Sequence, residues 1–166
     1  VPSKLQVILK IITTIERVNR HKKIKVRDIQ IISFLLMTRK QDEIGRLLQI
    51  NTGEGKTLLI QMICAYFALK GKSVDVVTSS VTLAERDSKE GENFFDALGL
   101  SVGFVSGTPE KKIFESNILF GTVHSFCSAR LHKFTAGEDI MLGRKSDFLV
   151  VDEVDSMMID KPEIQT

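Results

Sequence analysis

A run of small, basic and hydroxyl residues in the first half of the chain has the composition of a phosphate-binding loop. Residues 51–57 read Asn-Thr-Gly-Glu-Gly-Lys-Thr. Gly53 and Gly55 permit backbone angles that residues with a Cβ avoid, so consecutive amides can turn toward one anion. Lys56 can reach the β- and γ-phosphates of a nucleotide, and the Thr57 hydroxyl can ligate Mg²⁺. The chemistry indicated is binding of ATP or ADP with Mg²⁺.

The residues around this loop support the same interpretation. Residues 46–50 are apolar-rich and predict a strand, although Ile50 stands where the general motif has its first glycine. Residues 58–69 predict a helix that ends before Gly71. A strand before the loop and a helix after it are its required context, and the helix N-terminus adds partial positive charge. We expect the nucleotide to contact Thr52, Gly53, Glu54, Gly55, Lys56 and Thr57, with the Glu54 side chain turned to solvent.

Acidic residues follow an apolar run near the end of the chain. Residues 147–151 predict a strand, and Asp152 and Glu153 come directly after it. Ligands of parallel α/β sheets bind at the carboxyl ends of the strands, so Asp152 and Lys56 can meet although they are far apart in sequence. Asp152 is predicted to hold Mg²⁺, through a water in the usual geometry. Glu153 is predicted to orient and deprotonate the attacking water, so Glu153 and Lys56 are the candidate catalytic residues.

The remaining pattern predicts the scaffold that positions these residues. Hydrophobic periodicity predicts helices and strands in alternation after an N-terminal pair of helices. The expected helices span residues 5–18, 27–37, 58–69, 82–98 and 123–134, and the expected strands span 46–50, 73–78, 100–105, 118–120 and 147–151. This alternation predicts an α/β fold, a RecA-like P-loop NTPase built as a three-layer sandwich with a mostly parallel sheet.

Composition and charge exclude several classes of protein. The 166 residues are 43% hydrophobic and 27% charged, which is ordinary for one globular domain. A net charge of +2 argues against a dedicated nucleic-acid binder or a membrane-surface protein. No apolar run is long enough for a membrane span. Cys64 and Cys127 form neither a disulfide framework nor a metal site, which favours a reducing compartment.

Taken together, the motifs resemble the SecA family, the ATPase motor of preprotein translocation, more than the DEAD-box RNA helicases. The two most specific segments are Thr-Gly-Glu-Gly-Lys-Thr at 52–57 and Asp-Glu-Val-Asp-Ser at 152–156. Asp-Ile-Gln at 28–30 resembles the family's Asp-Val-Gln, which implies that Gln30 hydrogen-bonds adenine. Further segments resemble the family in order: 77–80, 83–87, 98–103, 120–122 and 159–160.

The resemblance implies an organisation and a role. Residues 1–37 would form an N-terminal helical segment, and residues 38–166 would be the first part of a SecA-like DEAD motor lobe, truncated after the acidic motif. The full-length protein would hydrolyse ATP to move polypeptides, and the isolated fragment would be weak or inactive because the second lobe's arginines are missing. The implied partners are a second motor lobe and a preprotein-binding domain of the parent chain, a polypeptide substrate and a translocon. The implied location is cytoplasmic, including a peripheral position at a membrane.

Two alternatives remain open from the sequence. A nucleic-acid helicase lobe would share the loop and the acidic motif, although near-neutral charge disfavours it. A non-hydrolysing nucleotide-binding interaction module could keep the fold, although it would not require Lys56, Thr57, Asp152 and Glu153 together.

Overall fold

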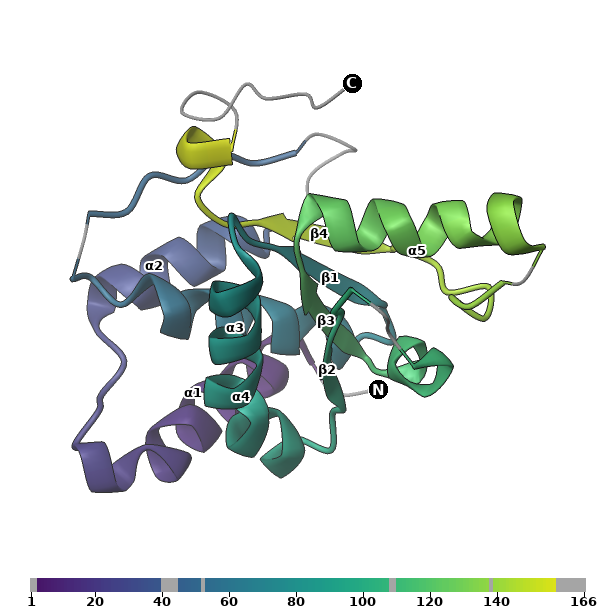
Figure 1. Cartoon of the computed structure of the whole chain (residues 1–166). Coiled ribbons are helices and arrows are strands. Elements are labelled where there is room, and N and C mark those ends of the chain that lie inside the picture. The colour runs from purple at the N-terminus through teal and green to yellow at the C-terminus, as the bar shows by residue number, and fades with distance from the viewer. Residues whose placement is uncertain (1–2, 40–44, 52, 108–109, 138, 158–166) are drawn as a thin grey trace.

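Four parallel strands form the centre of the molecule (Figure 1). The computed structural model describes residues 3–39, 45–51, 53–107, 110–137 and 139–157. The strands are β1 (Val74–Val77), β2 (Val102–Phe104), β3 (Ile118–Gly121) and β4 (Phe148–Val151), in the spatial order β2-β3-β1-β4. The helices are α1 (Lys4–Val18), α2 (Asp28–Met37), α3 (Lys56–Ala68), α4 (Val81–Ala97) and α5 (Val123–Ala136), with short 3-10 helices at Arg20–Lys22 and Lys111–Glu115.

Helices α3 and α4 cover one face of the sheet, and α1 and α2 pack against them from outside. Helix α3 is predominantly apolar after its first turn, which is typical of a helix buried between layers. Its Met62, Cys64 and Ala65 are fully buried. On the sheet, the Phe148 ring stacks on the Phe67 ring with centroids 3.6 Å apart. The main core therefore joins α1, α2, α3, α4 and the sheet in one apolar cluster.

Helix α5 lies on the opposite face of the sheet (Figure 1). A second apolar cluster forms there around Leu119, with Phe126 and Ala129 of α5 and with Met141 from the segment before β4. The predicted α/β sandwich with a parallel sheet is therefore confirmed. Coverage of this face by the described residues is incomplete, because Leu149 and Val151 on β4 are 56% and 40% exposed.

The prediction of a strand before the phosphate loop is wrong for the described segment 45–51, which has no regular secondary structure. A strand needs a neighbour for its ladder of backbone hydrogen bonds, and none of the described strands pairs with this segment. Its apolar side chains are explained by packing, because Leu48 and Ile50 contact the main core while Leu47 is 85% exposed. Apolar composition here reflects contact with the core.

Helix α2 forms where the periodicity predicts it, but its apolar stripe faces outward. Its buried residues are Gln30, Ser33 and Phe34. Ile29 and Ile32 are 51% and 53% exposed. The inward face carries Phe34, which packs in the main core, and Gln30, whose amide contacts the phosphate loop.

A buried ion pair fixes the segment that leads into β4. The Arg144 guanidinium lies 3.0 Å from the Asp75 carboxylate of β1, and both side chains are only 4% exposed. Arg144 also donates to the backbone carbonyls of Val74, Phe114 and Ser116. One side chain therefore ties together the amino ends of β1 and β3 at the edge of the sheet opposite the phosphate loop.

Over the described residues, no helix has the length and apolar character needed to cross a membrane.

Candidate functional site

The phosphate loop is held in an open turn by two glycines and leads directly into α3. Gly53 and Gly55 have φ values of 86° and 76°, in the left-handed region where glycine carries no steric penalty. Gly55 is the N-cap residue of α3, so Lys56 and Thr57 are its first residues. The first amides of an α-helix have no partner inside the helix and point outward from its end. This end of α3 is therefore suited to an anion such as a phosphate.

Helix α2 braces the loop through its buried amide side chain. Gln30 Nε2 donates to the carbonyls of Glu54 and Gly55, at 2.9 and 3.0 Å, and Gln30 Oε1 accepts from the Arg27 amide at 2.9 Å. A Cβ built on Gly55 would lie 2.3 Å from Gln30 Nε2, so a side chain at position 55 would displace the Gln30 amide from the loop. The contact of Gln30 with adenine stays a prediction; in this conformation its amide binds the loop.

Glu54 contacts Arg27, the residue that precedes α2, so the expectation that it simply faces solvent is wrong in part. The Glu54 carboxylate accepts from Arg27 Nη1 at 3.0 Å, and the same Arg27 nitrogen donates to the Gly53 carbonyl at 3.2 Å. Both side chains are more than 40% exposed, so the pair contributes about 0–1 kcal/mol to stability.

Two sequence predictions fall outside the described residues. They concern Thr52 of the phosphate loop and the SecA-like segment 159–160.

The two distant motifs meet at the carboxyl end of the sheet, as the sequence predicts. Lys56 Nζ lies 2.8 Å from Asp152 Oδ1, and the Asp152 side chain is 13% exposed. The parallel pairing of β4 with β1 positions Asp152, because its amide donates to the Val77 carbonyl at 2.8 Å. Partial burial lowers the pKa of Lys56, but the hydrogen bond and charge of Asp152 outweigh it, so the pKa is raised. Lys56 is therefore a cation throughout the neutral range.

Glu153 follows Asp152 in a conformation that is uncommon for a residue with a side chain. Its φ is 57°, in the left-handed region, which costs about 1–3 kcal/mol for a residue other than glycine. Its carboxylate accepts a hydrogen bond of 2.6 Å from the Ser79 hydroxyl. Strain of this kind gathers at functional sites, and here it occurs at the residue predicted to be the general base.

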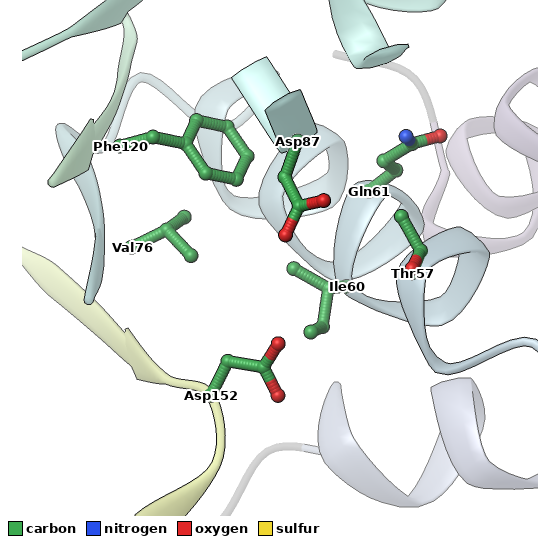
Figure 2. A pocket seen from close by; sticks show the side chains of 7 residues that line it. All are labelled: Thr57, Ile60, Gln61, Val76, Asp87, Phe120 and Asp152. Atoms are coloured by element: carbon green, nitrogen blue, oxygen red, sulfur yellow. The ribbon is translucent and has the colours of Figure 1, made fainter. Parts of the chain in front are cut away.

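A third carboxylate, Asp87 of α4, faces the same region (Figure 2). Asp87 and Asp152 both line a cavity of about 10 Å³, together with Thr57. Burial raises the pKa of the Asp87 carboxyl, and the negative charge of Asp152 raises it further. The contact of Asp87 with the Arg86 guanidinium at 2.7 Å lowers the pKa, but by less, so the pKa is raised overall. A cavity of this size holds about one water molecule, and Asp87, Asp152 and Thr57 all contribute to its lining.

The sequence interpretation did not assign a role to Asp87 or Ser79, which appeared only within segments that resemble SecA. A signal for each was present. Asp87 belongs to the buried stripe of α4 with Ala84, Ser88 and Gly91, and an acid on the buried face of a helix is unusual. Ser79 follows β1 at the same distance as Glu153 follows β4. The signal at Asp87 can be recognised only when the buried face of α4 is known. The signal at Ser79 can be recognised only when it is known that β1 and β4 are neighbours.

The donor set suits a hard divalent cation with a nucleotide better than a cation held by protein alone. No group of three or more His, Cys, Asp or Glu residues forms a metal site within the described part of the chain. Mg²⁺ typically takes one or two protein carboxylates, with water and substrate phosphates supplying the other ligands. The Thr57 hydroxyl and the Asp152 carboxylate fit that arrangement.

The two cysteines lie in different environments. Cys64 is buried, which raises the pKa of its thiol, and Cys127 is exposed.

The chain has a parallel sheet with helices on both faces. At the carboxyl edge of that sheet, the phosphate-loop sequence meets an acid. These features define a RecA-like α/β domain of the DEAD-like kind. Comparison with known proteins agrees. The family model of the SecA DEAD-like domain matches residues 3–164, so the chain belongs to this family.

Individual relatives give the same result. A protein translocase subunit SecA from Helicobacter pylori is 35% identical over 156 residues, which cover 89% of this chain and 17% of the relative. The corresponding subunit from Campylobacter lari is 34% identical over 142 residues, which cover 81% of this chain and 16% of the relative. The chain thus spans about a sixth of the length of these relatives.

Proposed function

We propose that the chain is the ATP-binding part of a SecA-like protein translocation motor and that the full-length protein hydrolyses ATP with Mg²⁺. The observation that carries this proposal is the 2.8 Å contact between Lys56 and Asp152. It brings the end of the phosphate loop and the acidic motif to one point, where a nucleotide phosphate and its metal ion would need them. Membership of the SecA DEAD-like family supports the same conclusion.

Each residue at this point has a distinct task in the proposed reaction. The amides at the start of α3 and the Lys56 ammonium bind the phosphates. Because Lys56 is paired with Asp152 in this structure, binding requires Lys56 to exchange that carboxylate for a phosphate oxygen. The released Asp152 carboxylate and the Thr57 hydroxyl would then hold Mg²⁺, which neutralises charge on the phosphates. Glu153 accepts the proton of the attacking water.

Several consequences concern the parent protein. We propose that it acts on polypeptides, that a second motor lobe and a preprotein-binding domain complete it, and that it works in the cytoplasm, including at a membrane surface. The division into a helical segment at 1–37 and a lobe beginning at 38 stays part of the proposal. The isolated fragment is expected to bind nucleotide weakly and to turn it over poorly.

The test is a Mg²⁺-dependent titration with a fluorescent ATP analogue, comparing wild type with Lys56→Ala. Lys89→Ala is the matched control, because Lys89 is an exposed lysine paired with Glu85 at 2.7 Å. Saturable binding that is lost in Lys56→Ala and kept in Lys89→Ala supports the proposal. Equal binding by all three proteins would place the nucleotide elsewhere and refute it.

ATP turnover by the full-length protein separates the proposal from its alternatives. Glu153→Gln should retain ATP binding and lose turnover, because the amide cannot accept the proton. A non-hydrolysing module would show no turnover in wild type. Stimulation by RNA or DNA, and none by unfolded polypeptide, would favour the helicase alternative.

A further inference from the structure

The parallel pairing of β1 with β4 brings Ser79 next to Glu153. Val77 is the partner of Val151 in the register of the two strands. Ser79 and Glu153 each lie two residues beyond these partners, so both leave the sheet at its carboxyl edge. Their side chains meet there, with Ser79 Oγ 2.6 Å from Glu153 Oε2.

The neighbouring hydroxyls serve the local backbone. Thr78 Oγ1 donates to the Ser80 carbonyl at 3.0 Å. Ser80 Oγ caps α4 by accepting from the Leu83 amide at 3.3 Å. The Ser79 hydroxyl instead donates across to another strand's acidic motif. This division indicates that Ser79 acts on the site, while Thr78 and Ser80 shape the turn.

The backbone of Glu153 is fixed, but its side chain has rotatable bonds that the backbone does not control. The Asp152 amide is bonded to Val77, and the Glu153 carbonyl accepts from the Met157 amide at 3.1 Å. These bonds hold the left-handed conformation at φ 57°. A glutamate side chain still has several rotamers to choose from. The Ser79 hydroxyl selects one of them by a short bond to a charged acceptor, which is a strong type of hydrogen bond.

The bond leaves Glu153 able to accept a proton. An ionised carboxylate has about four acceptor sites, and Ser79 uses one of them. Among the described residues, Ser79 is the hydrogen-bond partner of this carboxylate, so Glu153 keeps about three acceptor sites that a water molecule can use. Ser79 therefore restricts the direction of the carboxylate without consuming its function.

We propose that Ser79 is a positioning residue that orients the Glu153 carboxylate for proton transfer. This inference rests on the proposed function, because it requires Glu153 to be the general base. A base that is misplaced by about 1 Å can lose up to about 100-fold in rate. The expected loss on removing Ser79 is about tenfold in kcat, since the backbone of Glu153 stays in place.

The experiment measures steady-state ATP hydrolysis by the full-length protein for wild type, Ser79→Ala, Ser79→Thr and Ser79→Val. The Thr and Val variants are nearly equal in shape and differ in the hydroxyl, so they separate the hydrogen bond from packing. Ser101→Ala is the control, because Ser101 donates to Asn117 at 3.0 Å at the opposite edge of the sheet. Thermal melting and binding of a fluorescent ADP analogue verify that each variant is folded.

The expected result is a drop of about tenfold in kcat for the Ala and Val variants, with KM for ATP within about twofold of wild type. The Thr variant should recover most of the rate, and Ser101→Ala should match wild type. In a Glu153→Gln background, measured by single turnover, Ser79→Ala should cause no further loss.

Three results would overturn the inference while the proposed function stands. They are a kcat for Ser79→Ala within about twofold of wild type, equal rates for the Thr and Val variants, or a full tenfold loss in the Glu153→Gln background. The proposed function is tested separately, by measuring ATP hydrolysis by the wild-type protein. If wild type does not hydrolyse ATP under any condition that supports binding, both the function and the inference are refuted.

Discussion

Replacing Arg144 with alanine should destabilise the protein strongly, because it leaves a buried charge without its partner. Asp75 and Arg144 are each 4% exposed and lie 3.0 Å apart. Removing one member of a buried ion pair costs about 3–5 kcal/mol. The carbonyls that accept from Arg144 also lose their donor. Domains are stable by about 5–15 kcal/mol in total, so this single change would remove a large share of the stability.

The assays are urea unfolding and thermal melting, each followed by far-UV circular dichroism and by the fluorescence of Tyr66. Tyr66 is the only tyrosine in a chain without tryptophan, and its side chain is 1% exposed, so its signal reports on the core. For a domain of this size each kcal/mol shifts the melting temperature by about 2–4 °C. The expected loss for Arg144→Ala is therefore about 6–20 °C.

Two further variants identify the cause. Arg130→Ala removes an exposed arginine that donates to Ser146 at 3.0 Å, and it should cost less than about 0.5 kcal/mol. The double change Asp75→Leu with Arg144→Met removes both charges, and it should recover at least half of the loss, because apolar pairs often replace buried ion pairs without penalty. The reasoning is refuted if Arg144→Ala costs no more than Arg130→Ala, or if the double variant is as unstable as the single one.

Other predictions concern the candidate site. Gly55→Ala should weaken binding of a fluorescent nucleotide at least about tenfold, because the Cβ of the alanine would clash with Gln30. Gly71→Ala is the control, because Gly71 has the same φ of 76° as Gly55 and no close neighbour; it should leave nucleotide affinity within about twofold of wild type. Gln30→Ala should weaken ATP and GTP analogues by the same factor, because Gln30 binds loop carbonyls; a loss confined to the adenine nucleotide would show that it reads the base instead. Asp87→Asn should be at least as stable as wild type at neutral pH, because a raised carboxyl pKa means that the folded state loses stability as pH rises through that pKa. In urea unfolding the advantage of Asp87→Asn should shrink below about pH 4, where Asp87 is protonated in both states; an advantage that does not depend on pH would contradict this.

Much of the fold follows from local pattern. The alternation of strands and helices predicts a parallel sheet, and the rule that ligands bind at the carboxyl ends of its strands predicts that Lys56 and Asp152 meet. The 2.8 Å contact between them agrees with that reasoning. Helix α3 and strand β1 lie within about two residues of their predicted ends, because their apolar runs are bounded by glycine or polar residues.

The features that were not predictable depend on which segments become neighbours. Nothing within the local sequence around Arg144 or Asp75 indicates a partner about 70 residues away. The buried side of α2 could not be inferred either, because its stripe of isoleucine and leucine predicts the opposite face. The segment 45–51 has a strand's composition without a strand's hydrogen bonds, since a strand is defined by a neighbour as well as by its own residues.

Strand β4 has practical importance for anyone who handles this chain. It pairs with β1 along one side and, among the described strands, with none along the other. Its Leu149 and Val151 are exposed beside the side on which no described strand lies. An unpaired, apolar strand edge is a template on which a second molecule can add a strand. We predict that the chain self-associates as its concentration rises and that Leu149→Lys reduces this; equal self-association of wild type and Leu149→Lys in analytical ultracentrifugation would contradict the prediction.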